Sequence, residues 1–143
     1  MGRILAIDYG QKRAGLAVTD KDKIIATGLA TVHVKDLIQY LKDYLSREEV
    51  ECIVIGEPFD MQGKASDASR FIDPFVKHLK KQFPEIIVER MDERYTSQMA
   101  LQTILDAGIK KKARQNKELV DKISATIILQ SYMEMKSLRK KES

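Results

Sequence analysis

Strand-like and helix-like segments follow one another along the 143-residue chain in an order that is compatible with few folds. Three short apolar stretches come first, at residues 3–8, 14–19 and 24–31, and the polar turns between them predict an antiparallel meander. Helical and strand patterns alternate after the meander, and strands that are joined through helices run parallel with right-handed crossovers. The order predicts an α/β fold, a mixed five-stranded sheet of three antiparallel and then parallel strands, with helices on both faces.

Apolar residues at helical spacing predict two amphipathic helices in the middle of the chain. The first covers residues 34–45, where apolar side chains recur three and four positions apart. The second covers residues 68–79 and contains Pro74. A proline inside a helical pattern predicts either a kink or a helix whose regular part begins at Pro74, with Asp73 as its cap.

The remaining segments complete the sheet and add helices. The continuous apolar run ECIVIG, residues 51–56, is typical of a central strand that is buried on both faces, and residues 85–94 form the fifth strand. A short helix is expected over residues 96–107, before Gly108, and a long one over 116–135. No repeat or linker interrupts this series, so residues 1–143 are expected to form a single domain.

The charge of the chain is moderately basic and uneven. Lys and Arg number 25 against 21 Asp and Glu, which gives a net charge of +4. Much of the excess lies in IKKKARQNK, residues 109–117, and KSLRKK, residues 136–141, neither of which has an apolar face for membrane insertion. The clustering favours a polyanionic partner. The alternative is a solubilising loop and a frayed tail.

Cysteine content and hydropathy predict a soluble, cytoplasmic protein that does not bind membranes. Cys52 is the one cysteine of the sequence, so it has no internal disulfide partner, as expected in a reducing compartment. No apolar run approaches the roughly 20 residues that a bilayer requires, and the N-terminus MGRILAIDYG does not resemble a secretory signal.

Three acidic residues are candidates for a catalytic site. Asp8 ends the first strand, and Glu93 lies where the fifth strand gives way to a helix. Asp121 lies near the start of the last helix, where the small residues Ser124 and Ala125 would allow close approach to the sheet. Converging carboxylates repel one another, and oxygen-ligated divalent cations compensate that repulsion; two such ions about 4 Å apart can drive phosphodiester hydrolysis. The pattern predicts a site for Mg²⁺ or Mn²⁺, with two ions.

Each acid also has a structural interpretation that the sequence leaves open. Asp8 could accept backbone hydrogen bonds from its own turn, and Glu93 could form an ion pair with Arg90 or Arg94. Asp121 could be an exposed acid that stabilises the helix through its dipole. The catalytic interpretation rests on the combination, in the order strand end, strand end, last helix.

Four segments resemble the motifs of the YqgF/RuvX family of RuvC-like, RNase H-fold nucleases. They are IDYGQKRAGLAVTD, VIGEPFDMQGKASD, MDERYTS and VDKISATIILQSY, and they occur in the family's order over nearly the whole chain. The resemblance implies an RNase H-like fold and a metal-dependent hydrolase that acts on phosphodiester bonds. The family is associated with maturation of the 5′ end of pre-16S ribosomal RNA, and was earlier proposed to resolve Holliday junctions.

The resemblance also implies site residues. The family's acidic site falls on Asp8, Glu93 and Asp121, while Arg13 and Arg94 match basic positions that would hold phosphates. Lys12 accompanies Arg13 in the first turn. The basic segment beside the site is predicted to grip phosphates through Lys110, Lys111, Lys112 and Arg114.

Two departures from the pattern affect the expected ligand set. RuvC has a second aspartate three residues after its last-helix acid, and here that position is Ser124. Glu57 stands where many family members have an apolar residue, so it is either a fourth ligand or a solvated loop residue. Asp92 is another candidate, but neighbours in a regular strand face opposite ways, so Asp92 and Glu93 should not both bind metal.

Other functional classes remain as alternatives. The hairpin Asp8-Tyr9-Gly10 is similar to the phosphate hairpin of ATP-handling relatives, but the sequence has no second Asp-x-Gly. A non-catalytic RNA-binding module is the other alternative. Tyr9 and Tyr95 could stack on bases or pack in the core. The expected partners are structured RNA or branched DNA, with the ribosome as a further candidate, for a monomer or a homodimer.

Overall fold

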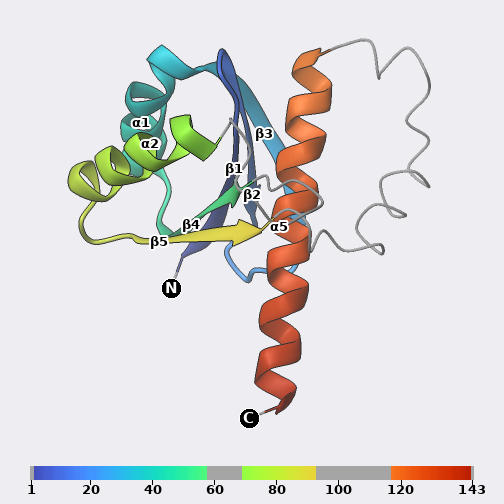
Figure 1. Ribbon diagram of the computed structural model, residues 1–143. Helices are drawn as coiled ribbons and strands as arrows, with labels where there is room; N and C mark the ends of the chain where they lie inside the picture. Colours follow the sequence, from blue (N-terminus) through green and yellow to red (C-terminus); the bar gives the residue numbers. More distant parts are fainter. Residues whose placement is uncertain (1, 58–68, 93–116, 143) are drawn as a thin grey trace.

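The computed structural model describes residues 2–57, 69–92 and 117–142. In chain order, the helices and strands are β1 (Arg3–Tyr9), β2 (Arg13–Thr19), β3 (Ala26–His33), the 3₁₀ helix η1 (Val34–Asp36), α1 (Leu37–Arg47), β4 (Val50–Glu57), α2 (Ser69–Gln82), β5 (Ile87–Asp92) and α5 (Lys117–Glu142). The helices α1 and α2 lie against one face of the sheet and α5 lies against the other (Figure 1). None of the helices that the structure describes is long and apolar enough to span a bilayer.

The five strands form one mixed sheet in the order β3-β2-β1-β4-β5. β1 pairs antiparallel with β2, and β2 pairs antiparallel with β3. β1 pairs parallel with β4, and β4 pairs parallel with β5. The predicted architecture is confirmed, because the meander and the parallel strands share β1 at the centre of the sheet.

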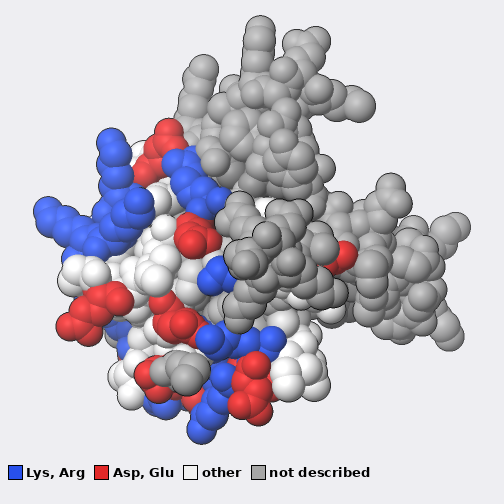
Figure 2. Space-filling model, turned by 90° about the horizontal axis from the view of Figure 1, so that it is seen from below, with Lys and Arg blue, Asp and Glu red and all other residues white. Residues whose placement is uncertain are grey.

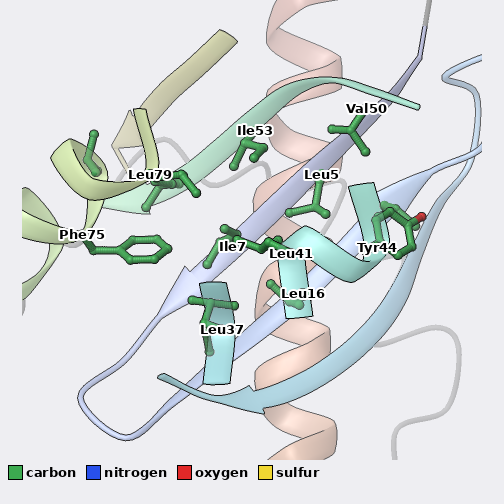
Figure 3. Packing of buried hydrophobic residues seen from close by; sticks show 14 of the residues in the cluster. Leu5, Ile7, Leu16, Leu37, Leu41, Tyr44, Val50, Ile53, Phe75 and Leu79 are labelled. Carbon is green, nitrogen blue, oxygen red and sulfur yellow. The ribbon is translucent and has the colours of Figure 1, made fainter. Parts of the chain in front are cut away.

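Alternation along the central strands divides the buried side chains between two cores. Leu5 and Ile7 of β1 belong to the core under α1 and α2, together with Ile53 of β4 (Figure 3). Ile4 and Ala6 belong to the core under α5. Because successive strand residues point to opposite faces, the even positions of β1 face α5 and the odd positions face α1 and α2.

Small residues line the contact between α5 and the central strands. Ala125 of α5 is completely buried in the same core as Ala6 of β1 and Ala17 of β2. Alanine at all three positions lets the helix backbone lie close to the sheet. The close approach expected from Ser124 and Ala125 is confirmed at Ala125.

The third strand begins two residues later than predicted, at Ala26. The side chain of Asp20 accepts hydrogen bonds from the backbone N–H groups of Ile24 and Ile25, at 2.7 and 2.9 Å. Lys23 completes this turn with a φ of 58°. The aspartate therefore holds the two isoleucines in the turn, 71% and 62% exposed, in place of strand pairing.

The helix predicted over residues 68–79 is confirmed, and of the two alternatives for Pro74 the one in which the regular part begins at Pro74, with Asp73 as its cap, is wrong. α2 begins at Ser69 and contains Pro74 in its interior. Ile72 precedes the proline and is buried, as are Phe75 and Val76 after it, so burial of the apolar face continues across the missing hydrogen bond.

The ends of two further elements differ from the sequence prediction. β5 begins at Ile87, because the N–H of Ile86 closes a turn on the carbonyl of Phe83 (3.1 Å). α5 continues to Glu142, so residues 136–141 are helical and the frayed tail is wrong. The predicted short helix over 96–107 lies outside the described residues.

Candidate active site

Asp8 lies at the centre of the sheet, one residue before the end of β1. It is partly buried and shares its face with Ile4 and Ala6, the face that α5 covers. The carboxyl ends of the parallel strands β1, β4 and β5 meet at this edge. In open α/β sheets, ligands bind outside such strand ends. Asp8 therefore lies at the edge of the sheet where ligands bind in folds of this kind.

Glycines flank Asp8 on both neighbouring strands. Asp8 pairs with Gly15 of β2. On the other side, β1 and β4 are in register at Ile7 and Ile55, so one residue further along both strands Asp8 comes beside Gly56. Neither neighbour has a side chain, and both glycines are buried, so the Asp8 carboxylate is the one side chain that these three paired positions carry. An oxygen ligand of this kind suits a hard cation.

Gly10 shapes the turn that follows Asp8. Its N–H donates to the carbonyl of Arg13 (2.9 Å), and a Cβ at Gly10 would lie only 2.7 Å from that oxygen. The carbonyl of Lys12 accepts from the N–H of Val34 (2.9 Å), which ties the turn to the end of β3. The turn places the exposed Lys12 and the half-buried Arg13 a few residues from Asp8.

The start of α5 lies at the same end of the sheet as the β1–β2 turn (Figure 1). Asp121 is the fifth residue of this helix, one turn before the buried Ala125. The helix thus brings position 121 toward the sheet edge that holds Asp8; the Asp121 side chain lies outside the described residues.

Several predicted site residues remain predictions because of where they lie in the chain. Outside the described residues are Glu93, Arg94, Lys110, Lys111, Lys112 and Arg114, and also the side chains of Glu57 and Asp92. Within the described part of the chain, no group of three or more His, Cys, Asp or Glu could hold a metal ion. Of the three predicted acids, only Asp8 has a described side chain.

The register bears on the two additional ligand candidates. Glu57 pairs with Asp92 in the β4–β5 ladder. Both positions alternate with those of Cys52, Val54 and Met91, whose side chains lie in the core under α5. By strand register, positions 57 and 92 are thus outside the set that includes position 8, and their side chains lie outside the described residues.

Arg90 faces away from the candidate site. Its Nη1 lies 2.6 Å from Oδ1 of Asp73, an ion pair that joins β5 to α2. One of the two alternative ion-pair partners considered for Glu93 is therefore paired with another acid, on the α2 side of the sheet.

Tyr9 packs in the core. Its ring stacks on Phe75 of α2, with the ring centroids 4.4 Å apart and the planes at 18°. Burial raises the pKa of the Tyr9 hydroxyl above its usual value. The packing interpretation of Tyr9 is confirmed, and Tyr95 lies outside the described residues.

The opposite end of the sheet has charges of both signs. Arg3 forms an ion pair with Glu48 at 3.3 Å, and Lys23 forms one with Glu51. Seen from this side, Lys and Arg side chains are interspersed with Asp and Glu (Figure 2). Paired charges of this kind do not attract a polyanion as an unpaired basic cluster does.

A polar cluster under α5 was missed by the sequence analysis. The hydroxyl of Tyr132 donates to Oε2 of Glu89 at 2.5 Å and lies 3.7 Å from Sγ of Cys52. The three residues come from three different elements and are far apart in sequence. A local sequence pattern cannot predict a contact between residues that are so far apart in the chain.

The sequence matches a known family over most of its length. A sequence model of the RuvX family, described as Holliday junction resolvase, matches residues 2–135. A relative from Flavobacterium psychrophilum, described as "putative pre-16S rRNA nuclease", is 54% identical and the match covers 95% of this chain and 99% of the relative. A relative from Bacteroides thetaiotaomicron with the same description is 55% identical, with the same coverage.

The fold is also that of a solved structure. RuvC from T. thermophilus, in complex with a Holliday junction substrate, superposes with a TM-score of 0.59 at 15% identity. The match covers 94% of this chain and 96% of RuvC. The RNase H-like fold is thereby confirmed. From the family model and the relatives with more than half of their residues identical, the chain belongs to the RuvX family.

Proposed function

We propose that this protein is a metal-dependent nuclease that hydrolyses phosphodiester bonds in the 5′ region of pre-16S ribosomal RNA. The observation that carries the proposal is the position of Asp8, at the carboxyl edge of the central strand, on the face covered by α5 and between two glycines. A carboxylate at the carboxyl edge of a central strand has the position and the oxygen ligands that a divalent cation requires.

Asp8 would hold the divalent cations together with Glu93 and Asp121. Two bound Mg²⁺ or Mn²⁺ ions would supply an activated water and charge stabilisation at the leaving oxygen. Lys12 is exposed in the turn beside Asp8, and Arg13 begins the returning strand. These two cations would orient the phosphate chain over the strand ends, and Arg94 is proposed to assist them.

The description of the curated relatives favours RNA as the substrate. The RuvX family is described as Holliday junction resolvase and the RuvC structure contains a Holliday junction substrate, so branched DNA is the second candidate. A four-way junction would favour a symmetric dimer, whereas a single RNA end can be served by a monomer. Cleavage of the ribosomal RNA precursor would place the protein in the cytoplasm, with the ribosome as a candidate partner.

The experiment compares two labelled substrates, a pre-16S RNA fragment with its 5′ extension and a four-way DNA junction. Wild type and Asp8→Asn are purified in parallel and assayed with Mg²⁺, with Mn²⁺ and with EDTA. Metal-dependent cleavage of the RNA that Asp8→Asn loses supports the proposal, and cleavage of the junction alone supports resolution. Metal-independent binding without cleavage would overturn both in favour of an RNA-binding module.

A further inference from the structure

The hydrogen bond between Tyr132 and Glu89 joins a buried hydroxyl under α5 to a half-buried carboxylate of β5. Tyr132 is 2% exposed and Cys52, which its hydroxyl contacts, is 3% exposed. On the outer side, Nζ of Lys136 lies 5.3 Å from the centroid of the Tyr132 ring. Burial, and then the bond to Glu89, raise the pKa of the Tyr132 hydroxyl well above its usual value. The hydroxyl is therefore a permanent donor to the carboxylate.

This bond lies on the same stripe of α5 as position 121. Eleven residues separate Asp121 from Tyr132, which is about three helical turns or roughly 16 Å along the axis. Ala125, Ile128 and Leu129 lie between them, and all three are buried. A change in the rotation or depth of α5 at Tyr132 is thus transmitted along a rigid helix to position 121.

The other partner lies on the strand that leads to the second proposed acid. Glu89 is the third residue of β5, four positions before Glu93. Cys52 lies on β4, which pairs with β5. The cluster therefore joins α5 to β4, which lies beside β1, and to β5, the next strand of the sheet.

The core around this bond combines small and large side chains. Ala6, Ala17 and Ala125 allow α5 to approach the central strands closely, and Ile128 and Leu129 fill the space between them. Apolar packing has no preferred direction, whereas a hydrogen bond has a definite geometry, and leaving the buried tyrosine hydroxyl unsatisfied is costly. The pair is the feature of this interface best suited to select one arrangement.

We propose that the Tyr132–Glu89 hydrogen bond is a positioning contact, which sets α5 against β4 and β5 and thereby fixes where the helix presents Asp121 to the metal site. The effect of this bond on catalysis rests on the proposed function. The effect of the bond on the position of residues 117–125 of α5 does not. Tyr132 and Glu89 act through Asp121 and do not touch the substrate.

The test uses four single variants of the full chain. Tyr132→Phe removes the donor, Glu89→Leu removes the acceptor, and Glu89→Gln keeps an oxygen that can accept the bond. Tyr44→Phe is the matched control, because it also removes a hydroxyl from a buried tyrosine, here on α1 at the opposite face of the sheet. Three quantities are measured for each variant. They are the rate of amide hydrogen exchange over residues 117–125, the affinity for Mn²⁺ by calorimetry without substrate, and the dependence of kcat and KM on the Mn²⁺ concentration.

Tyr132→Phe and Glu89→Leu are expected to speed exchange over 117–125 severalfold and to weaken Mn²⁺ binding about tenfold, the weight of one hydrogen bond to a charged group. The RNA KM at saturating Mn²⁺ should change less than twofold. Glu89→Gln should stay close to wild type, and Tyr44→Phe should change none of these quantities.

Two results separate the failure of this inference from the failure of the proposed function. If Tyr132→Phe lowers Tm but changes exchange and Mn²⁺ binding no more than Tyr44→Phe does, the bond is structural only and the inference is overturned. If wild type neither cleaves RNA nor binds Mn²⁺, the proposed function fails, and exchange over 117–125 still decides the coupling. If Tyr132→Phe does not fold, Glu89→Leu against Glu89→Gln makes the same comparison.

Discussion

Gly28 of β3 lies directly against Lys122 of α5. A Cβ built on Gly28 would lie 3.3 Å from Cβ of Lys122, and 3.6 Å from Oγ1 of Thr126 one turn further along the helix. The first half of α5 therefore rests on the strand backbone itself at this point. Together with the buried Ala125, this contact keeps the helix segment near position 121 close to the sheet.

Replacing Gly28 by valine should force this contact apart. Valine adds branched carbon atoms where a single Cβ is already tight, and because Gly28 is exposed the cost should lie at the lower end of the range for overpacked cores, about 1 kcal/mol. We expect Gly28→Val to lower the free energy of unfolding by that amount, as measured by urea titration. Thr27→Val, at the neighbouring exposed position of β3, is the control and should change stability by less than about 0.5 kcal/mol. Equal effects of the two substitutions would contradict the close contact.

The sequence was sufficient for the arrangement of the sheet and for the position of Asp8. The alternation of apolar residues and the order of the segments can be read along the chain. They predicted the meander, the parallel strands and the small-residue face around Ala125. The start of β3 was mistaken because the side chain of Asp20 captures two backbone N–H groups that a strand pattern assigns to the sheet. In α2, the helix extends to the N-terminal side of Pro74, because the burial of Ile72 compensates for the hydrogen bond that the proline cannot make.

The tertiary contacts around the site could not be predicted from the sequence. Glu89 reads as an ordinary strand residue and Tyr132 as one apolar position in a long helix. Their hydrogen bond joins positions 43 residues apart and depends on how α5 crosses the sheet. Likewise, the flanking of Asp8 by Gly56 follows from the register of two parallel strands, which no segment encodes alone.

The space beside Asp8 can be tested by filling it. Gly15 pairs with Asp8, lies on the same face and is buried, so a valine there would crowd the space beside the carboxylate where we propose that the cation binds. We expect Gly15→Val to reduce Mn²⁺-dependent cleavage at least about tenfold, and Gly15→Ala to have a smaller effect, with β-sheet circular dichroism unchanged in both. A Gly15→Val protein that is folded and needs no more Mn²⁺ than wild type would show that the cation does not bind beside Asp8.

Asp20 makes stability depend on pH. Hydrogen bonds from the N–H of Ile25 and then of Ile24 lower the pKa of the Asp20 carboxyl below its ordinary value of 3.8. A carboxyl with a lowered pKa in the folded state contributes stability above the unfolded pKa, and the contribution is lost as the pH falls through the folded pKa. Asp20→Ala should therefore lower Tm at pH 7, and the difference from wild type should shrink as the pH is lowered below about 4.

Asp22→Ala is the control for this experiment, since it removes an exposed acid from the same turn. Thermal unfolding followed by circular dichroism between pH 3 and pH 7 measures both variants. A Tm difference for Asp20→Ala that is as large at pH 3 as at pH 7 would mean that the ionised carboxylate is not what holds the turn.

The basic segment before α5 is predicted to contact phosphates through Lys110, Lys111 and Lys112. Each phosphate contact on a single strand contributes a slope of about 0.7 to the dependence of log K on log salt concentration. Replacing the three lysines with alanine should weaken RNA binding and flatten that slope by up to about 2. The matched control replaces Lys77, Lys80 and Lys81, which are exposed on α2, at the face of the sheet opposite to Asp8. Both triple variants reduce the net charge from +4 by three, so a purely global charge effect would flatten both slopes equally. Flattening confined to the variant at 110–112 would assign the phosphate contacts to this basic segment.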